Sequence, residues 1–464
     1  MKLNQLTIRQ AQEGLKKKKF SSQELVQACL KRIKKLEPKI RAFITVTEKG
    51  TLKNAREVDQ TQPLLGIPIA VKDNFCTRGI KTTAGSKVLE NYIPVYDATV
   101  VKRLKEAGAI IIGKTNMDAW AHGSSTEASD FFTTHNPWNL NYLPGGSSGG
   151  SAAAVVADEV IGAIGSETAG SIRQPSAWCG AVGFKPTYGR VSRYGLIAMA
   201  SSLDSPGPIT KTVKDAALIL QVIAGQDKMD ATTATQTTAN YSTNLGQKIA
   251  GLKIGIPKEY FLKEMDREVA SAVHKAIKVL EKLGGQIKKI SLLDPKYSVA
   301  AYTIIQRSEV SSNLGRYDGI RYGRTRRFFG EEAKRRIMLG THTLLSGYHN
   351  QYYLKAQKVR RLICQDFDRV FKRVDVLIAP TTPSPALPLG ASVDEPMFGE
   401  LQDILVEAST LAGLPGMSLP CGFSLKGLPL AMQIIGPQFS EELLFQVGYV
   451  YEQATDWHQR KPKL

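Results

Sequence analysis

The sequence predicts an α/β protein built as one large domain. Residues 98–108 have a helical pattern and lead directly into the apolar strand 109–113, a unit typical of α/β proteins. Short apolar strands then alternate with helices through the rest of the chain. The length of 464 residues, of which 42% are hydrophobic and 22% charged, is enough to bury a large core, and no repeat of solenoid period is visible.

The first sixty residues are predicted to be helical, and a short apolar strand follows at 66–72. Ser21 followed by Glu24 has the spacing of a capping box at a helix start. Residues 226–248 fit either a linker or a surface loop, and residues 315–335 have the most loop-like, charge-dense composition. Further strands are expected at 253–256, 286–290, 374–379 and 430–435, and helices at about 266–283, 347–372 and 441–455.

The formal charge of +19 favours encounters with polyanions such as nucleic acid. These charges are not interleaved with aromatic residues as in RNA-reading motifs, so the sequence predicts proximity to a polyanion rather than base recognition. Much of the excess lies in Arg321, Arg324, Arg326 and Arg327, then in Lys334, Arg335 and Arg336.

The chain has no run of about 18 apolar residues and no apolar signal segment near its start, so we expect a cytoplasmic protein without membrane contact. Its cysteines are scattered and form no C-x-x-C pair, which favours reduced thiols over disulfides or a zinc site. No metal site is predicted. The five cysteines are Cys29, Cys76, Cys179, Cys364 and Cys421.

Two glycine-rich segments carry the strongest functional signal. Residues 144–151 read Pro-Gly-Gly-Ser-Ser-Gly-Gly-Ser and lead into an apolar helix, and residues 165–175 hold a second run of small residues. A linker rarely runs into an apolar helix, and a phosphate loop would need a lysine after the glycines. The segments therefore favour an acyl-transfer site, where hydroxyl nucleophiles stand beside backbone N–H groups that stabilise an oxyanion.

A catalytic serine needs a base, and the usual one is histidine. Lys72 is the better candidate here because it ends an apolar strand, where burial can lower a lysine pKa from about 10.4 toward about 7–8. Taken alone, this segment would favour a strand-end lysine that reaches solvent. None of the six histidines has a recognisable triad context; they are His122, His135, His274, His342, His349 and His458.

Three separated motifs resemble the amidase signature family: Gly66-Ile-Pro-Ile-Ala-Val-Lys72-Asp73-Asn74, Gly145-Gly-Ser147-Ser-Gly-Gly-Ser151 and Gly170-Ser171-Ile-Arg173. Ser171 follows Ser147 by 24 residues, as in that family. The resemblance implies one domain over residues 1–464 with a central mixed sheet flanked by helices. Its parts would be a helical segment at 1–62, a catalytic core at about 63–215, and a remainder that completes the sheet and the substrate pocket.

The resemblance also implies a Ser-Ser-Lys triad. Lys72 would be the base, Ser147 the relay, and Ser171 the nucleophile. A cis peptide bond is expected between Gly146 and Ser147. The candidate oxyanion donors are the backbone N–H groups of Thr168, Ala169, Gly170 and Ser171.

From about residue 5 to 455 the chain is similar to the glutamine-hydrolysing A subunits of tRNA-dependent amidotransferases, for example at 180–193, 308–313 and 334–341. This similarity implies that Arg336 binds the α-carboxylate of glutamine and Asp403 its α-ammonium, with Tyr302 and Ser124 in the same pocket. Arg336 also fits a solvated basic helix face, because two basic residues precede it.

The similarity further implies a heterotrimer, in which the other members are a small C subunit and a B subunit with kinase and transamidase activity. This chain would bind no cofactor itself. The B subunit would bind ATP and Mg²⁺ and use the ammonia to amidate Glu-tRNA(Gln), Asp-tRNA(Asn) or both, and tRNA would associate through the complex. Two alternatives are a stand-alone amidase for another small amide and a non-catalytic RNA-binding or scaffold subunit.

The sequence departs from the family's pattern at several positions. Ala169 stands where glycine is usual and Glu167 where aspartate is usual, so a positive φ at residue 169 would strain the backbone. Ala119-Trp-Ala-His122 replaces an acidic-aromatic-Ala-Met sequence at the pocket wall. Asp403 has atypical neighbours, and the loop 323–334 is shorter than usual.

Overall fold

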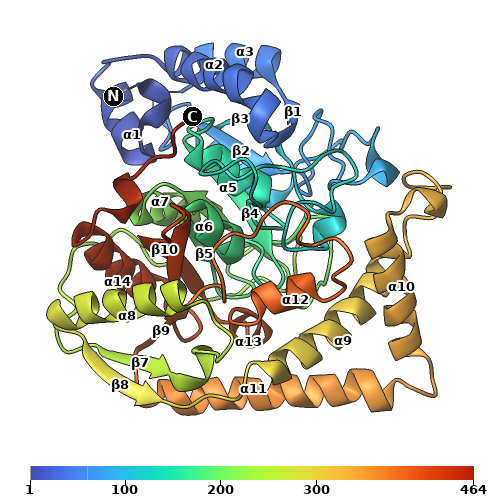
Figure 1. The fold of residues 1–464 in the computed structure, drawn as a ribbon. Helices are drawn as coiled ribbons and strands as arrows, with labels where there is room; N and C mark the ends of the chain where they lie inside the picture. The colour runs from blue at the N-terminus through green and yellow to red at the C-terminus, as the bar shows by residue number, and fades with distance from the viewer. Residues whose placement is uncertain (1, 60) are drawn as a thin grey trace.

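A computed structural model describes residues 2–59 and 61–464, and its strands form one eleven-stranded mixed sheet (Figure 1). The strand order is β1-β3-β2-β4-β6-β5-β10-β11-β9-β7-β8. β2 is parallel to β3 and β4, and β7 is parallel to β8 and β9, whereas the other neighbours are antiparallel. The predicted α/β class with a central mixed sheet is confirmed.

The strands are β1 (Phe43–Val46), β2 (Pro68–Lys72), β3 (Ile110–Thr115), β4 (Gly162–Glu167), β5 (Val182–Lys185), β6 (Ser205–Thr210), β7 (Lys253–Pro257), β8 (Gln286–Ile290), β9 (Val376–Pro380), β10 (Gly416–Phe423) and β11 (Pro429–Ile435). The helices are α1 (Ile8–Lys16), α2 (Ser22–Ile40), α3 (Glu48–Arg56), α4 (Thr99–Glu106), α5 (Gly149–Val156), α6 (Arg173–Cys179), α7 (Val213–Ile223), α8 (Arg267–Lys282), α9 (Lys296–Leu314), α10 (Glu331–Leu344), α11 (Lys355–Phe371), α12 (Phe398–Asp403), α13 (Glu407–Leu411) and α14 (Glu441–Gln453).

The predicted strands and helices are present with shifts of a few residues at their ends, apart from the helix predicted from residue 347, whose α-helical part begins at Lys355. The capping box is confirmed, since Ser21 Oγ accepts the N–H of Glu24 at 3.2 Å and the N–H of Ser21 donates to the Glu24 carboxylate at 2.8 Å. Residues 226–248 form a loop between α7 and β7, with the Gln236 carbonyl held by Arg190 at 2.9 Å.

Two expectations were wrong in part. Within the first sixty residues, Phe43–Val46 is a strand rather than helix, because it pairs antiparallel with β3 at the edge of the sheet. The loop-like segment 315–335 ends earlier than expected, since α10 begins at Glu331. The four residues of β1 depend on a partner strand far away in the sequence, and the charged first turn of α10 gives the start of that helix the composition of a loop.

The sheet brings the two glycine-rich segments together. All five residues of β2 are buried between parallel neighbours, which explains its uninterrupted apolar sequence. Its neighbour β4 runs in the same direction and leads into the 168–172 turn, while residues 144–148 precede α5, which packs on β2 and β4. The functional segments thus meet at the carboxyl ends of parallel strands, where ligands of α/β sheets commonly bind.

A frame of three long helices, α9, α10 and α11, packs together beside the sheet and extends away from it (Figure 1). α9 carries Tyr302 and α10 carries Arg336. Both predicted pocket residues therefore come from the frame rather than from the sheet. No helix in the described part of the chain has the length and apolar character needed to cross a bilayer.

Candidate active site

Lys72 is fully buried at the carboxyl end of β2. Its Nζ lies 2.7 Å from Ser147 Oγ and 3.1 Å from the carbonyl oxygen of Ser166 on β4. The amine therefore contacts two neutral oxygens. The alternative in which this lysine reaches solvent is wrong.

Burial lowers the pKa of the Lys72 amine from 10.5 to about 7, although the carboxylates of Asp118, Asp204 and Glu167 oppose the shift. A large fraction of the lysine is therefore neutral near pH 7. Neutral Nζ can accept the hydroxyl proton of Ser147, which is the requirement for a base at this position.

Backbone hydrogen bonds fix Ser147 on both sides. The peptide bond between Gly146 and Ser147 is cis, as predicted. The N–H of Gly146 donates to Gln174 Oε1 at 2.9 Å, and the N–H of Ser148 donates to the carbonyl oxygen of Ser171 at 3.2 Å. The segment that carries the predicted relay is thus held against the turn that carries the predicted nucleophile.

Ser171 lies in the turn between β4 and α6, and only 4% of it is exposed. Glu167 organises this turn, because its carboxylate accepts the N–H groups of Ile172 at 3.1 Å and Arg173 at 3.0 Å. The same carboxylate forms a buried ion pair with the Arg173 guanidinium at 2.6 Å, and Arg173 also donates to Gln433 on β11 at 2.8 Å. The unusual glutamate at this position therefore holds the nucleophile turn against the sheet.

The predicted oxyanion donors are available. Within residues 2–59 and 61–464, the backbone N–H groups of Thr168, Ala169, Gly170 and Ser171 donate to no protein acceptor. Ala169 does not have a positive φ, so alanine causes no strain there. Gly170 is needed for space, because a Cβ atom on it would lie 2.3 Å from Asp403 Oδ1.

Asp403 therefore lies directly against the nucleophile turn. Ser124 Oγ donates to Asp403 Oδ2 at 2.8 Å, while Oδ1 is buried and has no hydrogen-bond partner among the described residues. Burial raises the pKa of the Asp403 carboxyl well above its usual range, and Glu167 and Glu400 act in the same direction. An ammonium group that enters here would meet the unpaired oxygen of this carboxyl, and its positive charge would favour the ionised form.

Arg336 is buried, whereas the preceding Lys334 and Arg335 are partly exposed, so the solvated helix face is wrong for Arg336. Its Nε donates to Glu332, and its Nη2 lies 3.9 Å from Glu400 Oε1. Burial opposes the charge, but these two carboxylates outweigh it and shift the guanidinium pKa upward. Arg336 therefore remains a cation inside the protein.

Tyr302 shares this buried region. Burial raises the pKa of its hydroxyl well above the usual value, the charge of Arg336 opposes that shift, and Asp403 adds to it. Such mutual effects require proximity. The fold thus brings together the predicted pocket residues Ser124, Tyr302, Arg336 and Asp403 from four separate segments.

Sequence reasoning missed other buried polar groups around this pocket. Both ring nitrogens of His122, both polar atoms of the Gln306 side chain and both carboxylate oxygens of Glu407 lack hydrogen-bond partners within the described residues. Burial lowers the pKa of His122 well below its usual value, with further lowering by Arg336 and Arg307. Unpaired buried polar groups are costly and rare, so their concentration indicates a site for a polar ligand. Only His122 had a sequence signal, as a departure at the pocket wall.

Comparison with known proteins identifies the class. The chain matches the amidase family model over residues 24–445, and it belongs to that family. It is 53% identical to the A subunit of the glutamyl-tRNA(Gln) amidotransferase from Carboxydothermus hydrogenoformans over 486 aligned residues, with 100% of each chain covered.

Solved structures share this fold. The crystal structure of the glutamyl-tRNA(Gln) amidotransferase A subunit from Thermotoga maritima superposes with a TM-score of 0.85 and 44% identity, covering 96% of this chain and 94% of that one. A 6-aminohexanoate cyclic dimer hydrolase superposes with a TM-score of 0.91 at 26% identity and 99% coverage of both chains. Because that hydrolase is named for a different substrate, the fold alone does not select the amide.

Proposed function

We propose that this chain is the amidase subunit of a tRNA-dependent amidotransferase of the glutamine-hydrolysing glutaminyl-tRNA synthase type. It releases ammonia from glutamine for the amidation of Glu-tRNA(Gln), Asp-tRNA(Asn) or both. The observation that carries the proposal is the buried Lys72–Ser147 contact of 2.7 Å, held beside the Ser171 turn that Asp403 touches. The chain is 53% identical over its full length to the A subunit of a glutamyl-tRNA(Gln) amidotransferase, which favours this function over that of a stand-alone amidase.

The reaction begins with Lys72 in its neutral form. Its Nζ takes the hydroxyl proton of Ser147 while Ser147 takes that of Ser171, and Ser171 Oγ attacks the carboxamide carbon of glutamine. The N–H groups of the 168–171 turn stabilise the resulting oxyanion. When the C–N bond breaks, the proton returns through Ser147 to the leaving nitrogen and ammonia departs. Water then uses the same relay to hydrolyse the acyl-enzyme, which releases glutamate.

Opposite charges orient the substrate. The α-ammonium of glutamine binds the unpaired Asp403 Oδ1, and Arg336 binds the α-carboxylate in exchange for part of its contact with Glu332 and Glu400. A short amide without these two charged groups forms neither contact. The pocket therefore distinguishes glutamine by its α-carbon substituents as well as by its carboxamide.

The remaining steps belong to partner subunits. The described residues contain no cluster of three or more His, Cys, Asp or Glu side chains that could hold a metal ion. We propose a B subunit that binds ATP and Mg²⁺ and performs the kinase and transamidase steps, and a small C subunit, in a cytoplasmic heterotrimer. The +19 charge then attracts a tRNA that binds mainly to the partner.

The test is to measure ammonia release from glutamine by the isolated chain and by the complex, with and without charged tRNA. We expect hydrolysis of glutamine by the complex and transfer of the ammonia to the charged tRNA. A stand-alone amidase would show no dependence on partners and no preference for glutamine. A non-catalytic subunit would release no ammonia.

A separate measurement tests the electrostatic role. The side chain of Arg324 pairs with Glu90 at 2.8 Å, and Arg326 and Arg327 are exposed. Neutralising these three arginines should weaken tRNA association of the complex, most strongly at low salt, and leave glutamine hydrolysis unchanged. Tight and selective binding of one tRNA by the isolated chain at physiological salt would contradict this division of labour.

A further inference from the structure

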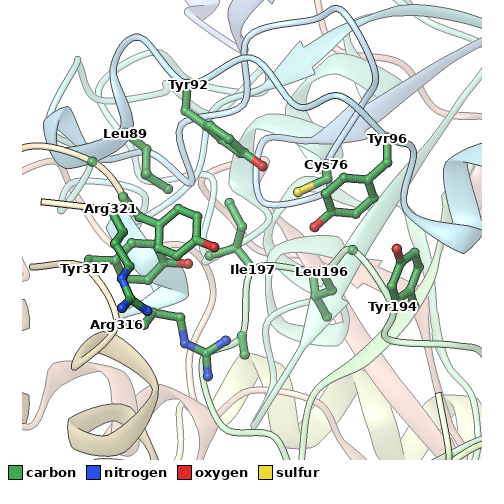
Figure 2. Close-up of a pocket in the computed structure, with 14 residues that line it drawn as sticks. Cys76, Leu89, Tyr92, Tyr96, Tyr194, Leu196, Ile197, Arg316, Tyr317 and Arg321 are labelled. Carbon is green, nitrogen blue, oxygen red and sulfur yellow. The ribbon is translucent and has the colours of Figure 1, made fainter. Parts of the chain in front are cut away.

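A cavity of about 620 Å³ lies outside the proposed catalytic and glutamine-binding residues (Figure 2). Three segments form its walls: the loop after β2, the loop after β5, and the loop between α9 and α10. None of the residues proposed for the triad, the oxyanion hole or the glutamine pocket lines it. Its aromatic residues are Tyr92, Tyr96, Tyr194, Tyr317 and Tyr322.

The tyrosines give the cavity walls that are both apolar and hydrogen-bonding. Figure 2 shows Tyr92 and Tyr96 at the top of the cavity, Tyr194 below Tyr96, and Tyr317 at the left beside Arg316 and Arg321. The rings of Tyr96 and Tyr194 lie 5.5 Å apart. Tyrosine-rich cavities of this kind suit the central anchor of a protein interface, because they bury a large side chain and still offer hydroxyl groups.

The charge of the cavity is positive. Arg316 and Arg321 are exposed and line it, and no Asp or Glu is among its lining residues. Arg316 donates to Asn313 Oδ1 at 3.1 Å, and within residues 2–59 and 61–464 neither guanidinium forms an ion pair. Asp318 accepts the backbone N–H groups of Ile320 at 2.8 Å and Arg321 at 3.1 Å. Two guanidinium groups are therefore left for an anionic ligand.

The rim of the cavity is aliphatic. Ile93 and Val95 lie between Tyr92 and Tyr96 and are 54% and 84% exposed, and Ile320, next to Arg321, is 89% exposed. Exposed aliphatic side chains beside an aromatic cavity are typical of protein interfaces. Nucleic acid would satisfy the arginines and stack on the rings, but it has no aliphatic surface with which to cover this rim.

We propose that this cavity is the docking site for an acidic segment of a partner subunit. The segment inserts an aromatic or large aliphatic side chain among the tyrosines, its carboxylates pair with Arg316 and Arg321, and its apolar flanks cover Ile320 and the 93–95 loop. This inference rests on the proposed function, because it takes the occupant to be another subunit of the amidotransferase.

Charge reversal tests the docking site. The double variant Arg316→Glu with Arg321→Glu should bind the purified partner subunits roughly thirtyfold or more weakly by isothermal titration, because reversal turns two attractions into repulsions. The matched control is Lys275→Glu with Lys278→Glu, which makes the same charge change at exposed positions on α8, a helix that contributes no residue to the cavity. Ile320→Asp should also weaken binding, and Leu425→Asp, at a residue that is 97% exposed, is its control.

Thermal unfolding of the isolated variants reports on folding and should match that of the original chain. Equal partner affinity for the double variant and its control would overturn the docking site while leaving the proposed function intact. Failure of the unaltered chain to bind any partner or to hydrolyse glutamine would instead contradict the proposed function. Weaker tRNA binding with unchanged partner affinity would make the cavity an RNA site and refute the proposal.

Cross-linking identifies the occupant directly. A photoreactive p-benzoylphenylalanine in place of Tyr96, which is 37% exposed, should form a cross-link with a partner subunit in the assembled complex. The expected peptide contains Asp or Glu close to an aromatic or large aliphatic residue. A cross-linked peptide without acidic residues, or no cross-link to a partner in a complex that assembles, would overturn the assignment.

Discussion

Replacing Lys72 by methionine separates the chemistry of this lysine from its contribution to folding. The side chain is fully buried and its pKa is lowered from 10.5 to about 7. In the unfolded chain at pH 7 the amine is protonated, whereas in a large fraction of the folded molecules it has lost its proton. This release costs roughly 4 kcal/mol at pH 7, since each unit of pKa shift is worth about 1.36 kcal/mol.

Methionine removes this cost and loses the two hydrogen bonds to Ser147 and Ser166. Each such bond contributes about 0.5–1.5 kcal/mol. We therefore expect Lys72→Met to raise the free energy of unfolding by about 2 kcal/mol at pH 7, measured by chemical denaturation, while glutamine hydrolysis falls to background.

The pH dependence has a definite sign. Because the folded pKa lies below the unfolded one, the cost of Lys72 is largest below pH 7 and disappears as the pH rises toward 10.5. The advantage of the methionine variant should shrink over that window. In the unaltered chain, kcat/KM for glutamine should rise about tenfold per pH unit below the Lys72 pKa of about 7 and level off about one unit above it. A variant less stable than the original chain at pH 7, or a flat activity profile across this range, would refute the buried-base reasoning.

Three further substitutions test the site. Ser171→Ala should abolish glutamine hydrolysis without loss of stability, and an acyl adduct trapped on any other residue would contradict its assignment as nucleophile. Arg336→Ala should impair glutamine hydrolysis far more than hydrolysis of a small amide that lacks an α-carboxylate. The control variant Lys334→Ala should change neither activity. Equal losses on both substrates would mean that Arg336 has a structural role. Glu167→Gln leaves the buried Arg173 charge without its carboxylate and should lower the free energy of unfolding by about 3–5 kcal/mol, whereas Glu167→Asp should cost less. If thermal unfolding showed that Glu167→Asp is less stable than Glu167→Gln, the Glu167 carboxylate would not be what holds the nucleophile turn in place.

Local signals in the amino-acid sequence are enough to predict the class of the fold and the segments that carry the chemistry. Strand character at 66–72 and the glycine-rich runs around Ser147 and Ser171 are such signals, because apolar patterning and glycine content act within a few residues. The resemblance then assigned Lys72 its role. Local pattern cannot report on edge pairing, which is why the strand Phe43–Val46 was missed.

How deeply the polar groups are buried, and which of them meet, follows from the packing of the whole chain. Arg336 follows two partly exposed basic residues, and its sequence context gives no sign that packing of the helical frame encloses it. Asp403 touches Gly170 across more than two hundred residues, and Arg173 joins Glu167 to Gln433. Burial and long-range pairing set the pKa values at the site and decide which of its polar groups are left without partners. Each depends on segments that are distant in the sequence, so no single stretch encodes them.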